Sequence, residues 1–112
     1  MNKSNGRGKE IGRTVGFLGQ RIASLSPEAL QCLINQAEKT NQEDSPQNRL
    51  DFFLNYYELS EVTISQINRL LRTAKKLGES GISPYLFYLY LNFGLEEFEQ
   101  NFLELKQQLT TG

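Results

Sequence analysis

Three serine–proline pairs, Ser26-Pro27, Ser45-Pro46 and Ser83-Pro84, constrain the fold of this chain more than any other feature. A serine side chain accepts a hydrogen bond from a free amide in the first turn of a helix. Proline is tolerated in that turn because its missing N–H would have had no partner there. Each pair therefore predicts the start of a separate helix.

The residues that follow the first two pairs repeat at helical spacing. The hydrophobic positions are Leu30, Leu33, Ile34 and Ala37 after the first pair, and Leu50, Phe53, Leu54 and Tyr57 after the second. Both sets have the i, i+3, i+4, i+7 pattern of one buried helix face. The polar residues 40–48 between them are expected to form a short loop.

A fourth helix is expected to begin at Thr63. Gln66 stands three residues later, which is the spacing of a capping box, and Gly78 is well placed to end the helix. Its hydrophobic side consists of Ile64, Ile67, Leu70, Leu71, Ala74 and Leu77. The other side carries Ser65, Arg69, Arg72 and Lys76.

The last third of the chain is the most hydrophobic. Residues 84–93 are apolar on nearly all sides, which predicts a helix that is central to the fold or partly an interface. Gly94 interrupts it, and a second stripe follows at Leu95, Phe98, Phe102, Leu105 and Leu109. Two heptads of this kind suffice for one helix to pack on another, within the chain or across a homodimer.

The N-terminal segment is polar, basic and glycine-containing. Residues 1–10 are expected to form a flexible basic arm. After it, Gly12, Gly16 and Gly19 share one face of a hydrophobic helical pattern, where they would let another backbone come close. The alternative is a loop that becomes helical only from Phe17.

These signals together predict an all-α fold. We expect a compact orthogonal bundle of five or six short helices in a single domain, residues 11–112, with the flexible basic arm in front. The single cysteine indicates a reducing compartment. No secretory signal is visible, and the longest apolar run has seven residues where about 20 would span a bilayer. We therefore expect a cytoplasmic protein without membrane contact.

Catalysis and metal binding are not expected. The chain has no histidine, the commonest general base near neutral pH, and its one thiol, Cys32, has no basic neighbour in sequence. Glu96, Glu97 and Glu99 flank a hydrophobic stripe as a solvated face would. We predict no enzymatic activity, no catalytic or metal site and no cofactor.

Charge is distributed in blocks along the chain. Residues 1–21 carry a net charge of +4, residues 22–68 of −5, residues 69–78 of +4 and residues 79–112 of −4. Such blocks either balance one another within the fold or meet a partner. The basic block at 69–78 forms a row of cations along one helix, an arrangement that suits contact with phosphate groups.

Residues 59–69, LSEVTISQINR, resemble the turn and recognition helix of bacterial helix-turn-helix regulators. The resemblance implies that Ser60, Ser65, Gln66 and Arg69 face DNA. Glu58 stands where that family usually has a glycine in left-handed conformation, and Leu54 where it usually has an alanine at the helix crossing. The nine residues TISQINRLL are also similar to part of the small helical subunit of type III CRISPR effectors.

Two functions therefore compete at this stage. The leading hypothesis is a small interaction protein (an adaptor, regulator or assembly subunit) that binds a protein partner or forms a homodimer. Its interface would consist of Tyr85, Tyr88, Phe98, Phe102, Leu105 and Leu109. The alternative is a subunit that binds DNA or RNA. Its contact residues would be Ser65, Gln66, Arg69, Arg72, Lys75 and Lys76, with Lys3, Arg7, Lys9 and Arg13.

Overall fold

Six helices make up the part of the chain that the computed structural model describes, and this part contains no strand. The described residues are 3–40, 43–76 and 81–111, with side chains over 10–40, 43–73 and 81–108. The helices are α1 (Lys3–Ser24), α2 (Pro27–Thr40), α3 (Pro46–Tyr56), α4 (Ile64–Lys76), α5 (Ile82–Phe93) and α6 (Leu95–Thr111). The predicted all-α bundle is confirmed.

Two of the three serine–proline pairs begin helices as predicted. The Ser26 hydroxyl accepts a hydrogen bond from the Ala29 amide at 3.1 Å, and the Ser45 hydroxyl accepts one from the Asn48 amide at 3.1 Å. The prolines that follow are the first residues of α2 and α3. Each serine therefore satisfies one free amide in the first turn of its helix.

The predicted capping box at the start of α4 is also present. The Thr63 amide donates to Gln66 Oε1 at 2.8 Å, and the Gln66 amide donates back to Thr63 Oγ1 at 3.2 Å. This reciprocal pair fixes where α4 begins. The predicted end at Gly78 lies outside the described residues.

The third pair does not cap its helix. Helix α5 begins at Ile82 after Gly81, so Ser83 and Pro84 lie inside its first turn. Ser83 is buried there, and its hydroxyl donates to the carbonyl of Leu25 at 2.6 Å, linking α5 to the end of α1. Proline is still tolerated because the first amides of a helix have no intrahelical acceptor.

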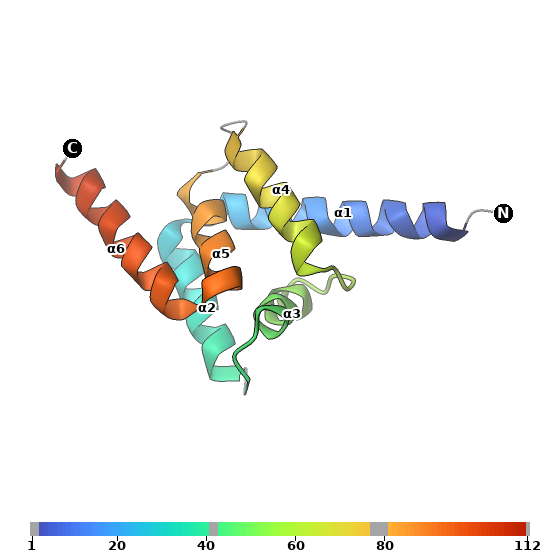
Figure 1. Ribbon diagram of the computed structural model, residues 1–112, viewed down its shortest axis with the longest axis horizontal. Coiled ribbons are helices and arrows are strands. Elements are labelled where there is room, and N and C mark those ends of the chain that lie inside the picture. Colours follow the sequence, from blue (N-terminus) through green and yellow to red (C-terminus); the bar gives the residue numbers. More distant parts are fainter. Residues whose placement is uncertain (1–2, 41–42, 77–80, 112) are drawn as a thin grey trace.

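Helix α5 is the centre of the bundle, one of the two alternatives that its composition predicted. It packs against each of the other five helices. Its ring residues meet α3 inside the core, where the Phe53 ring lies 4.7 Å from that of Phe87 and 6.3 Å from that of Tyr90, centre to centre. Figure 1 shows α4 crossing α1, with α2 and α5 at a steep angle to α1 near its end.

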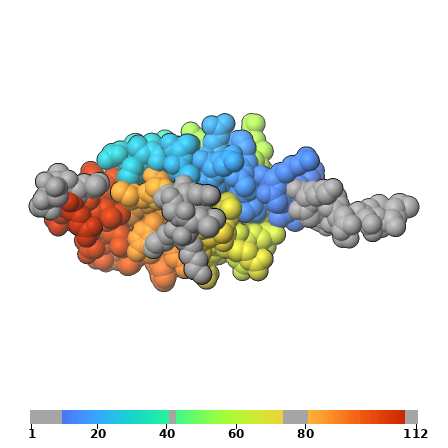
Figure 2. Space-filling model, turned by 90° about the horizontal axis from the view of Figure 1, so that it is seen from above, coloured from blue at the N-terminus to red at the C-terminus, as the bar shows by residue number. Residues whose placement is uncertain are grey.

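Helix α1 is continuous from Lys3, which is earlier than expected. Residues 3–10, predicted as part of an arm, are helical in this structure and extend the long axis at the end opposite to α6 (Figure 1). Figure 2 shows the coloured part of α1 and helix α6 on opposite sides of the molecule. The mobility of residues 3–10 stays a prediction. The alternative of a loop up to Phe17 is wrong.

Of the glycines at positions 12, 16 and 19 of α1, only Gly19 accommodates a neighbour. A Cβ atom on Gly19 would collide with the Leu70 side chain of α4, whereas one on Gly12 or Gly16 would have no atom within 4 Å. The neighbour at Gly19 is a side chain and not the backbone that was predicted to come close to this glycine face.

No helix in the described part of the chain is long and apolar enough to cross a membrane.

Gly94, with φ of 99°, separates α5 from α6. This left-handed conformation strains residues that carry a Cβ atom, so glycine suits the break that the sequence predicted there.

Candidate binding face on helices α4 and α5

One stripe of α5 remains at the surface. Tyr85, Tyr88 and Asn92 are half-buried, while most of the residues around them on this helix are buried. Their i, i+3, i+7 spacing places them in a single row. The central helix of the bundle thus presents two tyrosine rings and one amide to solvent.

Helix α4 contributes the second half of this surface. The Arg72 guanidinium lies over the Tyr88 ring, 5.8 Å from its centre. Asn68 and Asn92 pair their side-chain amides in both directions, at 3.1 and 3.0 Å. The two helices are therefore joined at the surface by a cation–π contact and a two-bond amide pair.

A shallow hydrophobic pocket lies within this surface. Leu71, Arg72, Pro84, Tyr85 and Tyr88 line it, and its volume is about 80 Å³. We call the surface formed by Arg72, Tyr85, Tyr88 and Asn92, together with this pocket, the α4–α5 face; Asn68, which pairs with Asn92, is buried. It combines flat rings, one cation and a small apolar recess.

The predicted protein interface is only partly at the surface. Phe98 and Phe102 are buried in the core of the same chain, with their rings packed edge to face at 5.6 Å, so their assignment to an interface is wrong. Leu105 is half-buried against the core. The side chain of Leu109 lies outside the described residues. Tyr85 and Tyr88 are half-buried, and their role in an interface stays a prediction.

The predicted nucleic-acid face of α4 is at the surface. Ser65, Arg69 and Arg72 are all exposed. Gln66 differs, because its carboxamide oxygen accepts both the amide and the hydroxyl of Thr63. The side chains of Lys75 and Lys76 lie outside the described residues.

Ser60 and Gln66 line an open groove that the helix-turn-helix resemblance did not anticipate. It lies between α1 and the segment before α4, has a volume of about 380 Å³ and also contains Glu10 and Glu61. Two carboxylates beside these polar groups disfavour phosphate binding in the groove. Any phosphate contact on α4 therefore has to be made by its arginine side.

The α1 cations do not extend the α4 surface in the described part of the chain. Arg13 is exposed, but on a helix of about 100° per residue it lies roughly 120° around α1 from Gly19, which faces α4. The side chains of Lys3, Arg7 and Lys9 lie outside the described residues.

The turn before α4 has one feature of the helix-turn-helix pattern. Glu58 has a φ of 56°, the left-handed conformation for which that family uses glycine. Helix α4 begins only at Ile64, so Leu59 to Thr63 still belong to the connection. Leu54, at the position of the family's alanine, is buried in the core.

Sequence reasoning missed the most exposed large hydrophobic side chains in the described structure. Phe93 is 62% exposed, Leu103 59%, Tyr56 53% and Phe17 38%. The off-register position of Leu103, outside the α6 stripe, was the available signal for its exposure. Phe17 and Tyr56 both pack on Tyr57, with ring centres 6.4 and 4.9 Å from it, so they form a second aromatic surface on α1 and α3.

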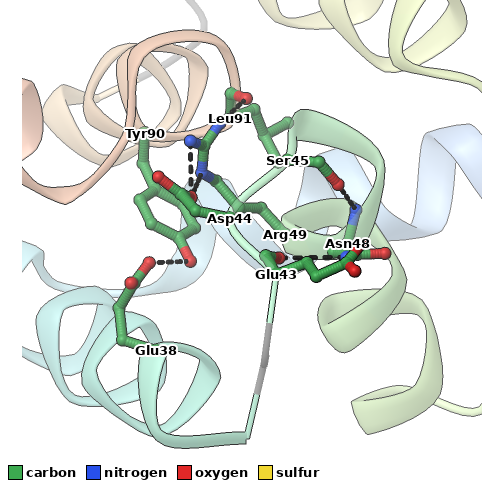
Figure 3. Close-up of polar contacts among 8 residues, drawn as sticks. All are labelled: Glu38, Glu43, Asp44, Ser45, Asn48, Arg49, Tyr90 and Leu91. Atoms are coloured by element: carbon green, nitrogen blue, oxygen red, sulfur yellow. Dashed lines mark hydrogen bonds and ion pairs between the residues drawn. The ribbon is translucent and has the colours of Figure 1, made fainter.

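A buried polar network, also missed, supports the far side of α5 (Figure 3). Arg49 is buried, pairs with Asp44 at 2.6 Å and donates through Nη1 to the Leu91 carbonyl at 2.9 Å. The Tyr90 hydroxyl donates to Glu38 at 2.8 Å. These contacts tie α2, α3 and the loop between them to the last turn of α5.

The alkaline stability of the protein is expected to depend on Tyr90. Burial, followed by the hydrogen bond to Glu38, raises the pKa of Tyr90 well above its usual value of 10.0. Below pH 10 the folded and the unfolded chain both keep the Tyr90 proton, so the contribution of Tyr90 to the free energy of unfolding is complete there. Above that pH the unfolded chain releases the proton first, so the free energy of unfolding falls by up to about 1.4 kcal/mol per pH unit. Urea unfolding of wild type and Tyr90→Phe between pH 9 and about 11.5 should show this extra slope in wild type alone. Equal slopes would contradict the assignment.

Cys32, the one thiol of the chain, is exposed on α2. Within the described residues, no group of three His, Cys, Asp or Glu side chains could hold a metal ion.

No family model, curated protein or solved structure matches the chain.

Proposed function

We propose that this protein is a small, non-enzymatic interaction protein of the cytoplasm that binds a protein partner through the α4–α5 face. The observation that carries the proposal is the Arg72–Tyr88 pair beside the apolar pocket. Tyrosine and arginine are enriched where binding energy is concentrated in protein interfaces, because they combine large contact areas with directional polar groups. The role is that of an adaptor, regulator or assembly subunit.

Rigidity of the face supports the same role. Tyr85 and Tyr88 belong to the central helix, and Asn68 and Asn92 fix α4 against it. Side chains held in place before binding lose less conformational freedom when a partner arrives. A mobile surface of equal area would bind more weakly.

Affinity capture from the source cell tests this proposal. The tagged full chain, an Arg72→Glu variant and a Lys39→Glu control should be compared. Lys39 is exposed on α2, which packs on another side of α5, and the control makes the same charge change. We expect Arg72→Glu to lose about tenfold or more of a specific partner, while Lys39→Glu keeps it. Equal recovery with both variants would refute the role of this face.

Nucleic-acid binding is the second candidate, favoured by the exposed Arg69 and Arg72 on one side of α4. Phosphate contacts of about four cations predict an affinity that falls several-fold to tens-fold or more when the salt concentration triples. Binding to duplex DNA and to RNA at two salt concentrations tests this candidate. Absence of binding at low salt would exclude it for the isolated chain.

A further inference from the structure

We propose that the α4–α5 face binds helix α6 of a second copy of this chain, so that copies associate head to tail. This inference rests on the proposed function and names the partner. Its two halves, an acidic knob and a basic socket, are both present on every copy.

The knob is the outer side of α6. Leu103 is 59% exposed at its centre, and Glu99 and Glu96 stand four and seven residues before it, on the same side of the helix. Glu104 lies at the edge of this side, about 100° around the helix from Leu103. These three glutamates are exposed, and the described structure gives none of them an ion-pair or hydrogen-bond partner. Lys106 stands on the other edge, with its ammonium over the Phe102 ring, so the surface is one leucine among three glutamates and one lysine.

The socket is the α4–α5 face. Its pocket of about 80 Å³ has apolar walls from Leu71 and Pro84, and Arg72 stands at the wall that α4 provides. Arg69, exposed on the outer side of the same helix, has no carboxylate partner within the described structure. A leucine side chain suits a small apolar recess, and the adjoining guanidinium groups suit its glutamate neighbours.

The opposite charge blocks of the chain do not neutralise each other across these two surfaces. Among the described side chains, the ion pair that forms is Arg49 with Asp44, and neither belongs to the knob or the socket. Among the described side chains, Arg69 and Arg72 of the socket and Glu96, Glu99 and Glu104 near the knob therefore remain available for a contact between molecules.

The two surfaces cannot meet within one copy. Leu105 packs on the core beside α5, and Leu103 lies about 160° around α6 from it, so the knob points away from α5 and the socket. A contact between knob and socket must join two molecules. Because the contact joins two different surfaces, each added copy still has one free knob and one free socket. Association therefore continues into chains unless the rotation between neighbouring copies closes a ring.

The contact is small compared with stable interfaces, which bury about 800 Å² on each partner. We therefore expect weak association that depends on concentration and on salt, because exposed arginine–glutamate pairs are screened. Sedimentation velocity of the full chain from roughly 5 to roughly 500 µM should show the average mass rising with concentration. The rise should shrink at high salt.

Charge reversal provides the decisive test. Arg69→Glu with Arg72→Glu makes the socket acidic, and Glu99→Arg with Glu104→Arg makes the knob basic; all four positions are exposed. Each double variant alone should associate about tenfold or more weakly than wild type. An equal mixture should associate again, because the basic knob of one variant fits the acidic socket of the other. Leu103→Ser, which leaves the charges intact, should also weaken association.

Three outcomes would overturn the inference: wild type that is monomeric over this range, association that the socket variant does not weaken, or double variants that stay monomeric when mixed. None of these results touches the proposed function itself, which fails if Arg72→Glu retains the partner captured from cells. The two failures are therefore distinguishable.

Discussion

Replacement of Phe98 by alanine is expected to lower the free energy of unfolding by about 3–5 kcal/mol. Phe98 is fully buried between α6 and the core, where its ring packs edge to face on Phe102. Alanine would remove the ring and leave a cavity that rigid neighbouring helices fill only in part. The loss would be a large share of the roughly 5–15 kcal/mol that stabilises a typical domain.

Urea unfolding followed by circular dichroism measures this loss, and Leu103→Ala is the matched control. Leu103 lies on the same helix but is 59% exposed, so its truncation should change stability by no more than about 0.5 kcal/mol. A cost below about 1 kcal/mol for Phe98→Ala would mean that Phe98 is not a core residue, and the interface first predicted for α6 would be open again.

Replacement of Arg49 by alanine is expected to cost about 2–3 kcal/mol. The change removes the donor to the Leu91 carbonyl near the end of α5, a buried acceptor that would be left without a partner. It also removes the packing of the arginine side chain over the Tyr90 ring, 5.8 Å away. The ion pair with Asp44 contributes less, because the Asp44 side chain is 67% exposed and stays solvated when the pair breaks.

Asp44→Ala distinguishes these causes in the same unfolding assay. It removes the ion pair and the hydrogen bond from Arg49 Nε to Asp44 at 2.9 Å but leaves the bond from Arg49 to Leu91, so we expect a smaller cost, about 1 kcal/mol. Arg49→Met, which keeps a long side chain without the polar contacts, should fall between the two. If Asp44→Ala costs as much as Arg49→Ala, the ion pair and not the carbonyl contact stabilises this junction.

Local signals predicted the helices well because they act within a few residues. Ser26, Ser45 and Thr63 each bond to an amide three positions away, so sequence alone places them. Ser83 has the same local pattern, but its hydroxyl bonds to Leu25, which is 58 residues distant. Only the folded chain creates that acceptor, and the start of α5 shifted accordingly.

The binding surface was less predictable because spacing reveals a hydrophobic face without revealing what covers it. The stripe through Phe98 and Phe102 suited an interface and a core equally, and the chain's own helices cover it. Tyr85 and Tyr88 lie in a segment that is apolar all round, so their exposure depends on where α4 packs. The cation–π contact between Arg72 and Tyr88 forms only when α4 packs on α5, so sequence spacing could not predict it.

The most direct test of the α4–α5 face is oxidative footprinting of tyrosines in the free chain and in the complex captured from cells. We expect Tyr88 to lose reactivity in the complex, while Tyr56, 53% exposed on α3, stays as reactive as in the free chain. Tyr56 thus serves as a control within the same molecule. Protection of Tyr56 with no change at Tyr88 would contradict the account and place the partner on α1 and α3.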